Sequence, residues 1–357
     1  MKTLIALCLL TLSSLALAAP KKELQIGGAY YRKIIHTKDL IADIMPPPTF
    51  IIESYLTTLL LLNETEMAMK DKKIDPLELR KIKNMIEELR MLKEGISGSD
   101  EIEGYFERIK IWKQDLPESR LKELIVVHSA QEAKNFYSIA ENKFIPLLLK
   151  GNVREAKVIL GELSSAYNMH KTIVEDAIQL ARKDIEELEK ETLKSKNPKD
   201  KMIKSEAYTK ILLLKDLISD ILPPPASVIE SYLNDLEMIY KVERNGSPGK
   251  EFEGLKKRSE ELEKAYMARF DYWKKNLDDK KLKDAFVSGN MSVFFNIQKS
   301  TFLKALDKND LVEAKKIFNS ELSPLYALHR QNIDSIVIMA DEQMLVLETE
   351  VVSKLSK

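Results

Sequence analysis

The chain carries two copies of a tyrosine–histidine pair whose residue types and spacing suit ligand recognition. Tyr167 and His170 are three residues apart, as are Tyr326 and His329, so each pair lies on one face of a helix. Arg330 comes next in the second copy, and a guanidinium can hold a carboxylate through two parallel hydrogen bonds. These residues are candidates for contact with a small polar molecule. A structural interpretation stands beside this one: core packing for the tyrosines, an internal hydrogen bond for the histidines and a solvated position for the arginine.

Acidic residues recur just before two runs of three prolines. Asp43 and Asp220 lie near the end of a predicted helix, where the helix dipole disfavours a carboxylate. Asp39 and Asp216 stand one turn earlier on the same face. This repetition predicts one of two arrangements: ion pairs with lysines of a neighbouring helix, or hydrogen bonds to a polar ligand.

The residues that follow the prolines are also repeated. Glu53 and Glu230 fall in the first turn of the next predicted helix, where a carboxylate is favoured. They are interpreted as capping residues or as ligand contacts. Tyr55 and Tyr232 come two residues later and are candidates to line a pocket.

The proline runs themselves interrupt a helical pattern. Residues 46–48 lack backbone donors, and each proline pushes the residue before it out of the α region. The first helix is therefore expected to stop near Ile44 and to restart near Thr49. Pro47 and Pro224 are the central prolines of the two runs. They are predicted either to bend the helix or to form the wall of a binding pocket.

Trp112 and Trp273 are the only tryptophans, one in each half of the chain, and they are expected in the core or in a pocket wall. A metal site is disfavoured because the histidines lack the spacing of paired ligands and the only cysteine is Cys8. The motifs G-x-S-x-G, G-x-G-x-x-G and the phosphate-binding loop are missing from the sequence. Neither an enzyme nor a cofactor is predicted.

The segments that position these residues have a helical period. Tyr55, Leu59 and Leu62 belong to one apolar stripe with spacings of three and four residues, and no long segment alternates with period two. The predicted fold class is all-α. Asn152 and Asp310 occupy the N-cap positions of two predicted helices, and a third is expected to begin after Asp75.

An internal repeat organises the chain. Between Tyr31 and Leu59, 18 of 29 positions are identical to those 177 residues later. Shorter matches follow, each at a smaller offset than 177: 105–116 with 266–277, 136–157 with 294–315, and 163–171 with 322–330. We expect two homologous tandem modules, residues 19–195 and 196–357, each an elongated four-helix bundle.

Bulk properties narrow the location and the partners. Residues 1–18 have the charged start, apolar stretch and small-residue cleavage site of a secretory signal peptide. The remaining chain has no cysteine and therefore no disulfide. Acidic and basic residues are equal at 56 each, which argues against nucleic acid as a partner. No later stretch is long and uncharged enough to cross a bilayer. A soluble periplasmic protein is predicted.

The segment "KDLIADIMPPPTFIIESYL", the aromatic residues around Trp112, and the Tyr-x-x-His stretch resemble the periplasmic sensor region of bacterial methyl-accepting chemotaxis proteins. The resemblance covers both modules, and the proline-Ile-Glu-Ser-Tyr-Leu core is its most specific part. It implies a helical bundle that binds a small ligand, pairs as a homodimer and communicates with a membrane receptor. This chain lacks the transmembrane and signalling parts of those proteins.

Two functions follow from these observations. The first is a periplasmic binding protein that recognises a small polar metabolite and presents it to a signalling partner. The second is a structural protein whose helical surfaces bind another protein without a small ligand. Ligand stabilisation would separate them, because only the first predicts it.

Overall fold

The computed structural model describes residues 22–44, 47, 49–69, 75–95, 104–221, 224 and 228–356. The predicted all-α class is confirmed: within these ranges the elements are helices, joined by turns and one isolated β-bridge between Gln25 and Met202. None of the described helices is long and apolar enough to cross a membrane. The predicted signal peptide, residues 1–18, and the side chains of Asp43 and Asp220 lie outside the described residues.

The first repeat begins with η1 (Lys22–Leu24) and ends with a helix of 42 residues. Its α-helices are α1 (Ala29–Ile44), α2 (Ile52–Ala68), α3 (Pro76–Glu94), α4 (Tyr105–Asp115), α5 (Arg120–Lys122), α6 (Ala130–Ile139), α7 (Ile145–Leu149) and α8 (Val153–Lys194). Two π turns, η2 (Glu123–Ser129) and η3 (Ala140–Phe144), connect α5, α6 and α7. The boundary expected at residue 195 coincides with the C-cap of α8.

The second repeat follows the short η4 (Pro198–Lys201) and is also made of helical segments. Its α-helices are α9 (Glu206–Ile221), α10 (Ile229–Asn245), α11 (Lys250–Asn276), α12 (Lys280–Ser288), α13 (Ser292–Ile297), α14 (Leu303–Asp307), α15 (Leu311–Ile317) and α16 (Ser323–Leu355). The π turns η5 (Gln298–Phe302) and η6 (Phe318–Leu322) lie between α13 and α14 and between α15 and α16. Where the first repeat has α3 and α4, the second has the continuous helix α11.

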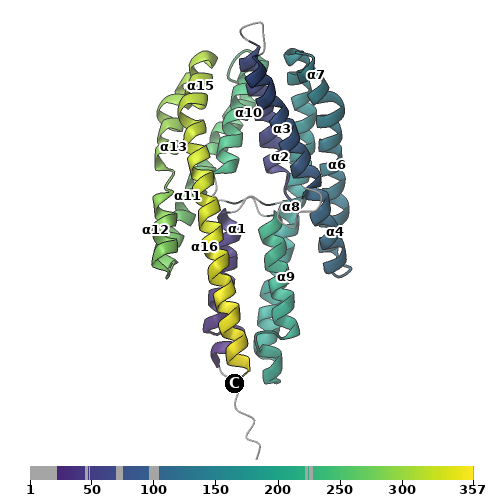
Figure 1. Cartoon of the computed structure of the whole chain (residues 1–357), viewed down its shortest axis with the longest axis vertical. Helices are drawn as coiled ribbons and strands as arrows, with labels where there is room; N and C mark the ends of the chain where they lie inside the picture. The colour runs from purple at the N-terminus through teal and green to yellow at the C-terminus, as the bar shows by residue number, and fades with distance from the viewer. Residues whose placement is uncertain are drawn as a thin grey trace, which may run out of the picture.

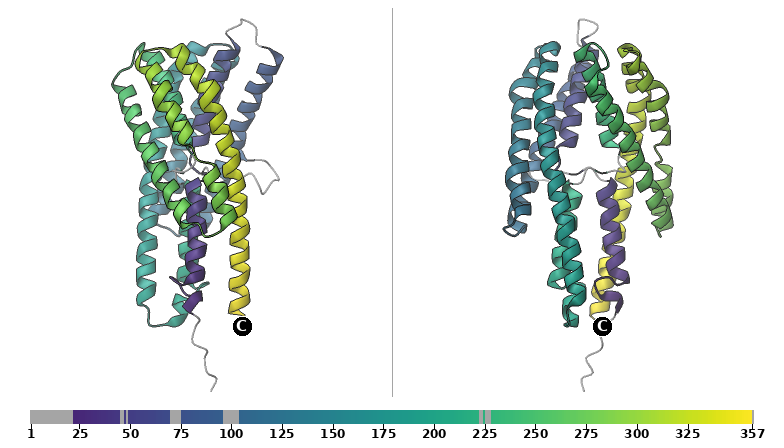
Figure 2. Two further views of the ribbon diagram at one scale, coloured as in Figure 1. Left: turned by 90° about the vertical axis from the view of Figure 1, so that its left-hand side faces the viewer. Right: turned by 180° about the vertical axis from the view of Figure 1, so that it is seen from behind.

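The repeats lie side by side above a shared stem of helices (Figure 1). The stem contains α1, α9 and the C-terminal halves of α8 and α16, as the rotated views also show (Figure 2). In the stem, α1 packs against α16 and α9 packs against α8, while α1 also contacts α9. The first helix of each repeat thus packs on the last helix of the other repeat. Above the stem, α2 and α10 join the two repeats.

The helix break at the prolines is close to the predicted one. The first helix ends at Ile44 as expected, whereas the next begins at Ile52, three residues later than Thr49. A turn explains the delay, since the amide of Phe50 donates to the carbonyl of Pro47 at 3.3 Å. Pro47 is buried, as is Pro224 in the second repeat.

Two of three predicted helix caps are confirmed. The carboxylate of Asp75 accepts from the amide of Leu77 and completes a capping box with Glu78. The carboxylate of Asp310 accepts from the amide of Glu313 at 3.0 Å. Asn152 does precede α8, but its side chain makes no capping hydrogen bond.

A one-residue insertion distinguishes the last helices of the two repeats. Lys157 matches Lys315 at an offset of 158, whereas Ser164 matches Ser323 at an offset of 159. The π turn η6 lies between these positions in the second repeat, while α8 is regular there. A π turn absorbs an extra residue without breaking the helix, so the change in offset explains the local geometry.

Candidate functional site

Ion pairs between the repeats come in matched sets, beginning in the stem. Lys38 lies 2.5 Å from a carboxylate oxygen of Asp216, and Lys215 lies 2.7 Å from one of Asp39. The two lysines match each other at the offset of 177, and so do the two aspartates. The prediction that these aspartates pair with lysines of a neighbouring helix is confirmed for Asp39 and Asp216.

A second matched set joins the helices that follow the prolines to the last helices. Glu53 of the first repeat pairs with Arg330 of the second, and Glu230 pairs with Lys171 in the opposite sense. Arg258 adds a second cation to Glu230 at 2.7 Å. Burial opposes ionisation of Glu230, but the two cations outweigh it and hold the pKa of this carboxyl below its usual value. The predicted ligand contacts Glu53 and Arg330 thus bind each other across the repeats, and Glu230 is bound by Lys171 and Arg258.

A four-membered network lies between the tops of α2 and α10. Lys157 pairs with Glu66 and, at 2.9 Å, with Glu243. Lys315 pairs with the same two glutamates at 2.9 and 3.2 Å. Burial opposes ionisation of Glu66, yet both lysines together lower its pKa. Because each lysine bridges both glutamates, the network ties all four participating helices together.

The aromatic candidates of the first repeat form a buried layer. The ring of Tyr55 stacks on that of Tyr167 with centroids 4.6 Å apart. His170 is fully buried, and its Nε2 lies 3.1 Å from the hydroxyl of Tyr105. Burial lowers the pKa of His170 to about 3, so the imidazole is neutral at physiological pH. The expectation of a hydrogen-bonded histidine is confirmed, with a more complete burial than predicted.

The second repeat builds a similar layer around Tyr232. Its ring stacks on Tyr326 at 4.2 Å, and its hydroxyl lies 2.6 Å from that of Ser323. His329 is 4% exposed and meets the ring of Tyr266 edge-on.

Both tryptophans belong to the core. Trp112 is 3% exposed and lies under the guanidinium of Arg108, while Trp273 is 1% exposed and packs on His36. Neither lines any of the cavities described below. Among the described residues, no cluster of three or more His, Cys, Asp or Glu side chains could hold a metal ion.

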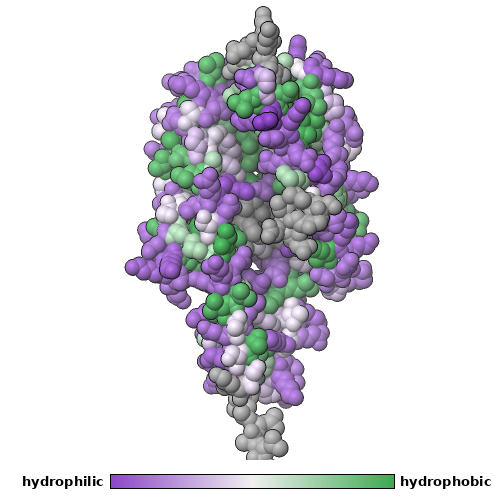
Figure 3. All heavy atoms as spheres, in the orientation of Figure 1, coloured by the Kyte–Doolittle hydropathy of each residue, from purple (hydrophilic) through white to green (hydrophobic). Residues whose placement is uncertain are grey.

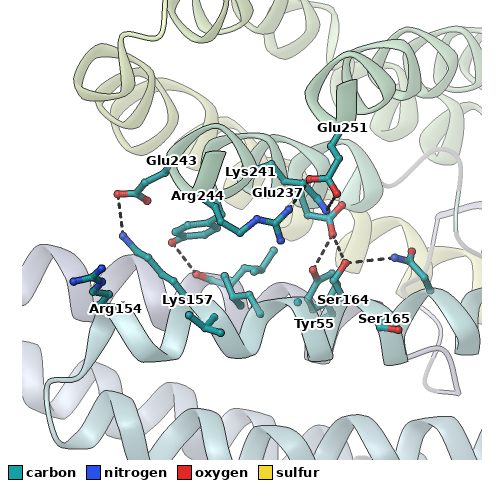
Figure 4. A pocket seen from close by; sticks show the side chains of 16 residues that line it. Tyr55, Arg154, Lys157, Ser164, Ser165, Glu237, Lys241, Glu243, Arg244 and Glu251 are labelled. Atoms are coloured by element: carbon teal, nitrogen blue, oxygen red, sulfur yellow. Dashed lines mark hydrogen bonds and ion pairs between the residues drawn. The ribbon is translucent and has the colours of Figure 1, made fainter. Parts of the chain in front are cut away.

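A cavity of about 680 Å³ opens between α2 and α8 of the first repeat and α10 of the second (Figure 4). Tyr55 is the predicted site residue that lines it. The other lining residues are Leu59, Arg154, Lys157, Val158, Leu160, Gly161, Ser164, Ser165, Asn168, Glu237, Tyr240, Lys241, Glu243, Arg244 and Glu251.

Glu237 is the central polar group of this cavity. Tyr55 donates its hydroxyl proton to a carboxylate oxygen of Glu237 at 2.8 Å, and Ser164 donates to the same oxygen at 3.4 Å (Figure 4). Burial raises the pKa of Glu237 above its usual value. No described lysine or arginine forms an ion pair with Glu237. A cationic group of a bound ligand can therefore form the ion pair with this carboxyl that no described lysine or arginine forms.

Three of the four cations that line the cavity have acidic partners. Lys157 belongs to the four-membered network, and Arg244 lies 2.5 Å from a carboxylate oxygen of Glu251. Lys241 is 3.7 Å from the same glutamate. Arg154, the fourth cation, and Glu237 are the lining residues of opposite charge type that form no ion pair among the described residues.

Gly161 leaves open space in the wall of the cavity. An added Cβ at this position meets no atom within 4 Å. In the second repeat Phe318, in the π turn, is fully buried and stacks on Tyr232 at 4.8 Å; it matches Leu160 at the offset of 158. The first repeat thus has an aliphatic side chain at the cavity where the second has a buried aromatic ring.

A second cavity, of about 850 Å³, lies beside the proline break of the second repeat, between α8, α10 and α11. The predicted site residues Pro224 and Glu230 line it. Pro224 therefore forms part of a pocket wall. The acids Asp39 and Glu230 on this wall are already paired with Lys215 and with Arg258, which leaves this cavity less suited to a polar ligand than the first.

The sequence analysis missed Glu237, Ser164 and Gly161. A signal was present in the repeat itself, since Glu237 stands where the first repeat has Leu60, 177 positions earlier. Positions where two copies of a repeat disagree in charge or size mark the places where they have specialised. Positions with the same residue in both copies, such as Asp39 and Asp216, instead form ion pairs that hold the repeats together.

No protein-family model, curated protein or solved structure matches the chain. The resemblance to chemotaxis sensor regions consequently depends on the quoted residues alone. Any function must be argued from the geometry of the cavity and of the surface.

Proposed function

We propose that this protein binds a small polar ligand in the cavity between its repeats, beside Tyr55. The observation that carries the proposal is Glu237, a carboxyl that faces an open cavity of about 680 Å³ with hydroxyl donors but no cation. Clefts with convergent polar groups are the usual binding sites for small molecules. An amine on the ligand would supply a cation to pair with Glu237.

The resemblance to chemotaxis sensors supplies the biological setting for this proposal. Each repeat corresponds to one four-helix sensor bundle, and the chain is exported to the periplasm through residues 1–18. The two bundles of one chain take the place of two separate subunits. This view is supported by the matched ion pairs, which resemble the self-complementary contacts of a symmetric dimer.

Thermal unfolding in the presence of a library of amines, amino acids and organic acids tests the proposal. A ligand at about 100 times its Kd should stabilise the protein by about 2.7 kcal/mol, which raises the Tm by roughly 4 °C. Gly161→Trp should abolish that shift, because the indole would fill the cavity while leaving the ion-pair network intact.

A matched pair of variants completes the experiment. Tyr55→Phe removes the hydroxyl that donates to Glu237 and should weaken the ligand response, whereas Tyr232→Phe changes the equivalent residue in the filled repeat and should leave it unchanged. The proposal is wrong if no compound in the library shifts the Tm. It is also wrong if the shift survives in Gly161→Trp.

A further inference from the structure

From residue 333 to residue 355, α16 has apolar residues on two separate faces. One face is buried and contains Ile333, Ile336, Ala340, Met344 and Val351. The other is open to solvent: Ile338 is 60% exposed, Leu345 67% and Val352 46%. A surface helix normally has one apolar face, so the exposed face of α16 needs a separate explanation.

The exposed residues form a continuous stripe. Ile338, Leu345 and Val352 are seven residues apart, and seven residues are almost two full turns of an α-helix. Val346 and Leu355 extend the stripe on either side at 57% and 37% exposure. Heptad spacing of this kind is typical of a seam that packs against another helix.

Acidic side chains flank the stripe. Between residues 331 and 353 the chain has five acidic residues and no lysine or arginine. Asp334, Asp341 and Glu348 lie on one side of the stripe and Glu342 on the other, and all four are exposed. Figure 3 shows hydrophobic residues among hydrophilic ones on the lower part of the molecule, where α16 faces the viewer.

The equivalent helix of the first repeat shows that the fold does not require this surface. The positions that match Ile338 and Leu345 at the offset of 159 are Gln179 and Glu186. The matching segment, residues 172–194, contains four lysines and arginines. Both helices pack in the same stem, yet only α16 has an acidic and apolar outer face.

A groove continues the stripe towards the neighbouring helices. A cavity of about 530 Å³ lies between α1, the turn from α11 to α12, and α16. Leu277, Leu282, Met339, Val346 and Leu347 contribute its apolar wall. An apolar side chain of a partner could enter this groove while the partner helix lies along the stripe.

We propose that the outer face of α16 is the docking surface for a basic amphipathic helix of another protein. The heptad stripe suits a helix, and the surrounding acids suit lysines and arginines at its edges. A second copy of this chain would place acids against acids. An anionic membrane surface would repel the same residues. The inference is independent of the ligand site, because the stripe and the cavity beside Tyr55 share no residue.

A fluorescent peptide of several heptads, with leucine at the seam and lysine at the flanks, tests the inference with the full chain. We expect binding that weakens when the ionic strength rises from about 0.05 M to about 0.3 M. A peptide with the same charge but serine in place of leucine should bind roughly tenfold more weakly. This second peptide separates docking along the stripe from simple charge attraction.

Matched variants locate the binding surface. The double change Ile338→Ser with Leu345→Ser should weaken binding of the leucine peptide by roughly tenfold or more. Val312→Ser removes an even more exposed apolar residue, on α15, and should have no effect. Circular dichroism confirms that both variants keep their helices.

Three results would overturn the inference. The first is peptide binding that does not change in the Ile338→Ser and Leu345→Ser variant. The second is self-association of the wild-type chain, seen by light scattering and abolished by the same two changes, which assigns the stripe to a second copy. The third is binding to vesicles that contain anionic lipid, again lost in the variant.

Discussion

Tyr55 and Tyr232 occupy equivalent positions in the two repeats, but their hydroxyl groups meet different surroundings. Tyr55 donates to Glu237 at the edge of an open cavity. Tyr232 contacts Ser323 and lies against the ring of Phe318, which fills the space. One inserted residue in η6 and one change from leucine to glutamate account for the contrast.

The comparison separates two kinds of residue. Residues that agree between the repeats, such as Lys157 and Lys315 or Glu66 and Glu243, hold the halves together through symmetric ion pairs. Residues that differ create the cavity. A duplicated chain can keep its interface from both copies while only one copy develops a binding site, because the two tasks fall on different residues.

The largest expected effect on stability comes from removing the buried ring of Phe318 in the second repeat. Phe318→Ala should destabilise the protein by about 4 kcal/mol, because it removes a fully buried ring that stacks on Tyr232. Leu160→Ala, at the cavity of the first repeat, should cost only about 2 kcal/mol, since space is already open there. Urea unfolding of both variants measures the difference. Equal losses would contradict the contrast between the filled and the open side.

The next effect concerns the symmetric network. Glu66→Gln leaves Lys157 and Lys315 with Glu243 alone and should cost about 2 to 3 kcal/mol at pH 7. Folding lowers the pKa of Glu66, so its ionised form stabilises the folded protein. This stabilisation is present at pH values above the usual pKa of 4.5 and is lost as the pH falls below it. The variant should therefore lose less stability than the wild type between about pH 5 and pH 3.

An exposed pair provides the control for that measurement. Glu107 lies 2.5 Å from Lys110 on the surface of α4. Glu107→Gln should change the free energy of unfolding by less than about 0.5 kcal/mol. A Glu66→Gln effect as small as this would show that the network adds little to the interface.

A smaller effect is expected in the core of the second repeat. Asp235 is fully buried and accepts from Gln298 at 2.6 Å, where the first repeat has Thr58. Burial raises the pKa of Asp235 well above its usual value. The folded protein therefore retains a proton that the unfolded chain releases, so stability falls as the pH rises above about 4.

Asp235→Asn removes this titration and keeps the acceptor for Gln298. The variant should gain at least about 1 kcal/mol relative to the wild type at pH 8, and its stability should vary less between pH 4 and pH 8. Unfolding curves across this pH range provide the measurement. A wild type whose stability is constant over the range would refute the expected protonation.

The smallest expected effect on stability comes from Gly161, which lines the cavity of the first repeat. Gly161→Ala should stabilise the free protein by about 0.5 to 1 kcal/mol, because glycine is costly within a helix and the added methyl group meets no atom. A single methyl group should leave ligand binding intact. If this change destabilises the protein, α8 requires glycine at position 161 for its local geometry, and the glycine is not explained by the need for open space in the cavity.

Much of the local structure could be predicted from the sequence. The helix stop at Ile44 and the caps at Asp75 and Asp310 follow from backbone chemistry within a few residues. The partner of α1 could not be predicted in this way. Since α8 and α16 are the equivalent helices of the two repeats, both present a suitable apolar stripe, and only the three-dimensional arrangement selects α16.

The cavity beside Tyr55 could not be predicted from the sequence for a related reason. Tyr55 was a candidate because it belongs to the repeated Ile-Glu-Ser-Tyr-Leu motif, while its acceptor Glu237 comes from the other repeat, 182 residues away. A cavity between two repeats combines side chains that no local pattern connects. The identity of such neighbours depends on how the repeats pack, which is a property of the whole interface.

The exchange of helices in the stem has a topological consequence. Glu23 and Lys354 lie 2.8 Å apart, so the two ends of the described chain meet at the base of the stem, beside the turn that joins α8 to α9. The described ends are therefore close enough for a short linker to join them. A circular permutant that joins these ends and opens the chain within residues 195–201 should therefore reach the same structure, with the order of the two repeats reversed along the polypeptide.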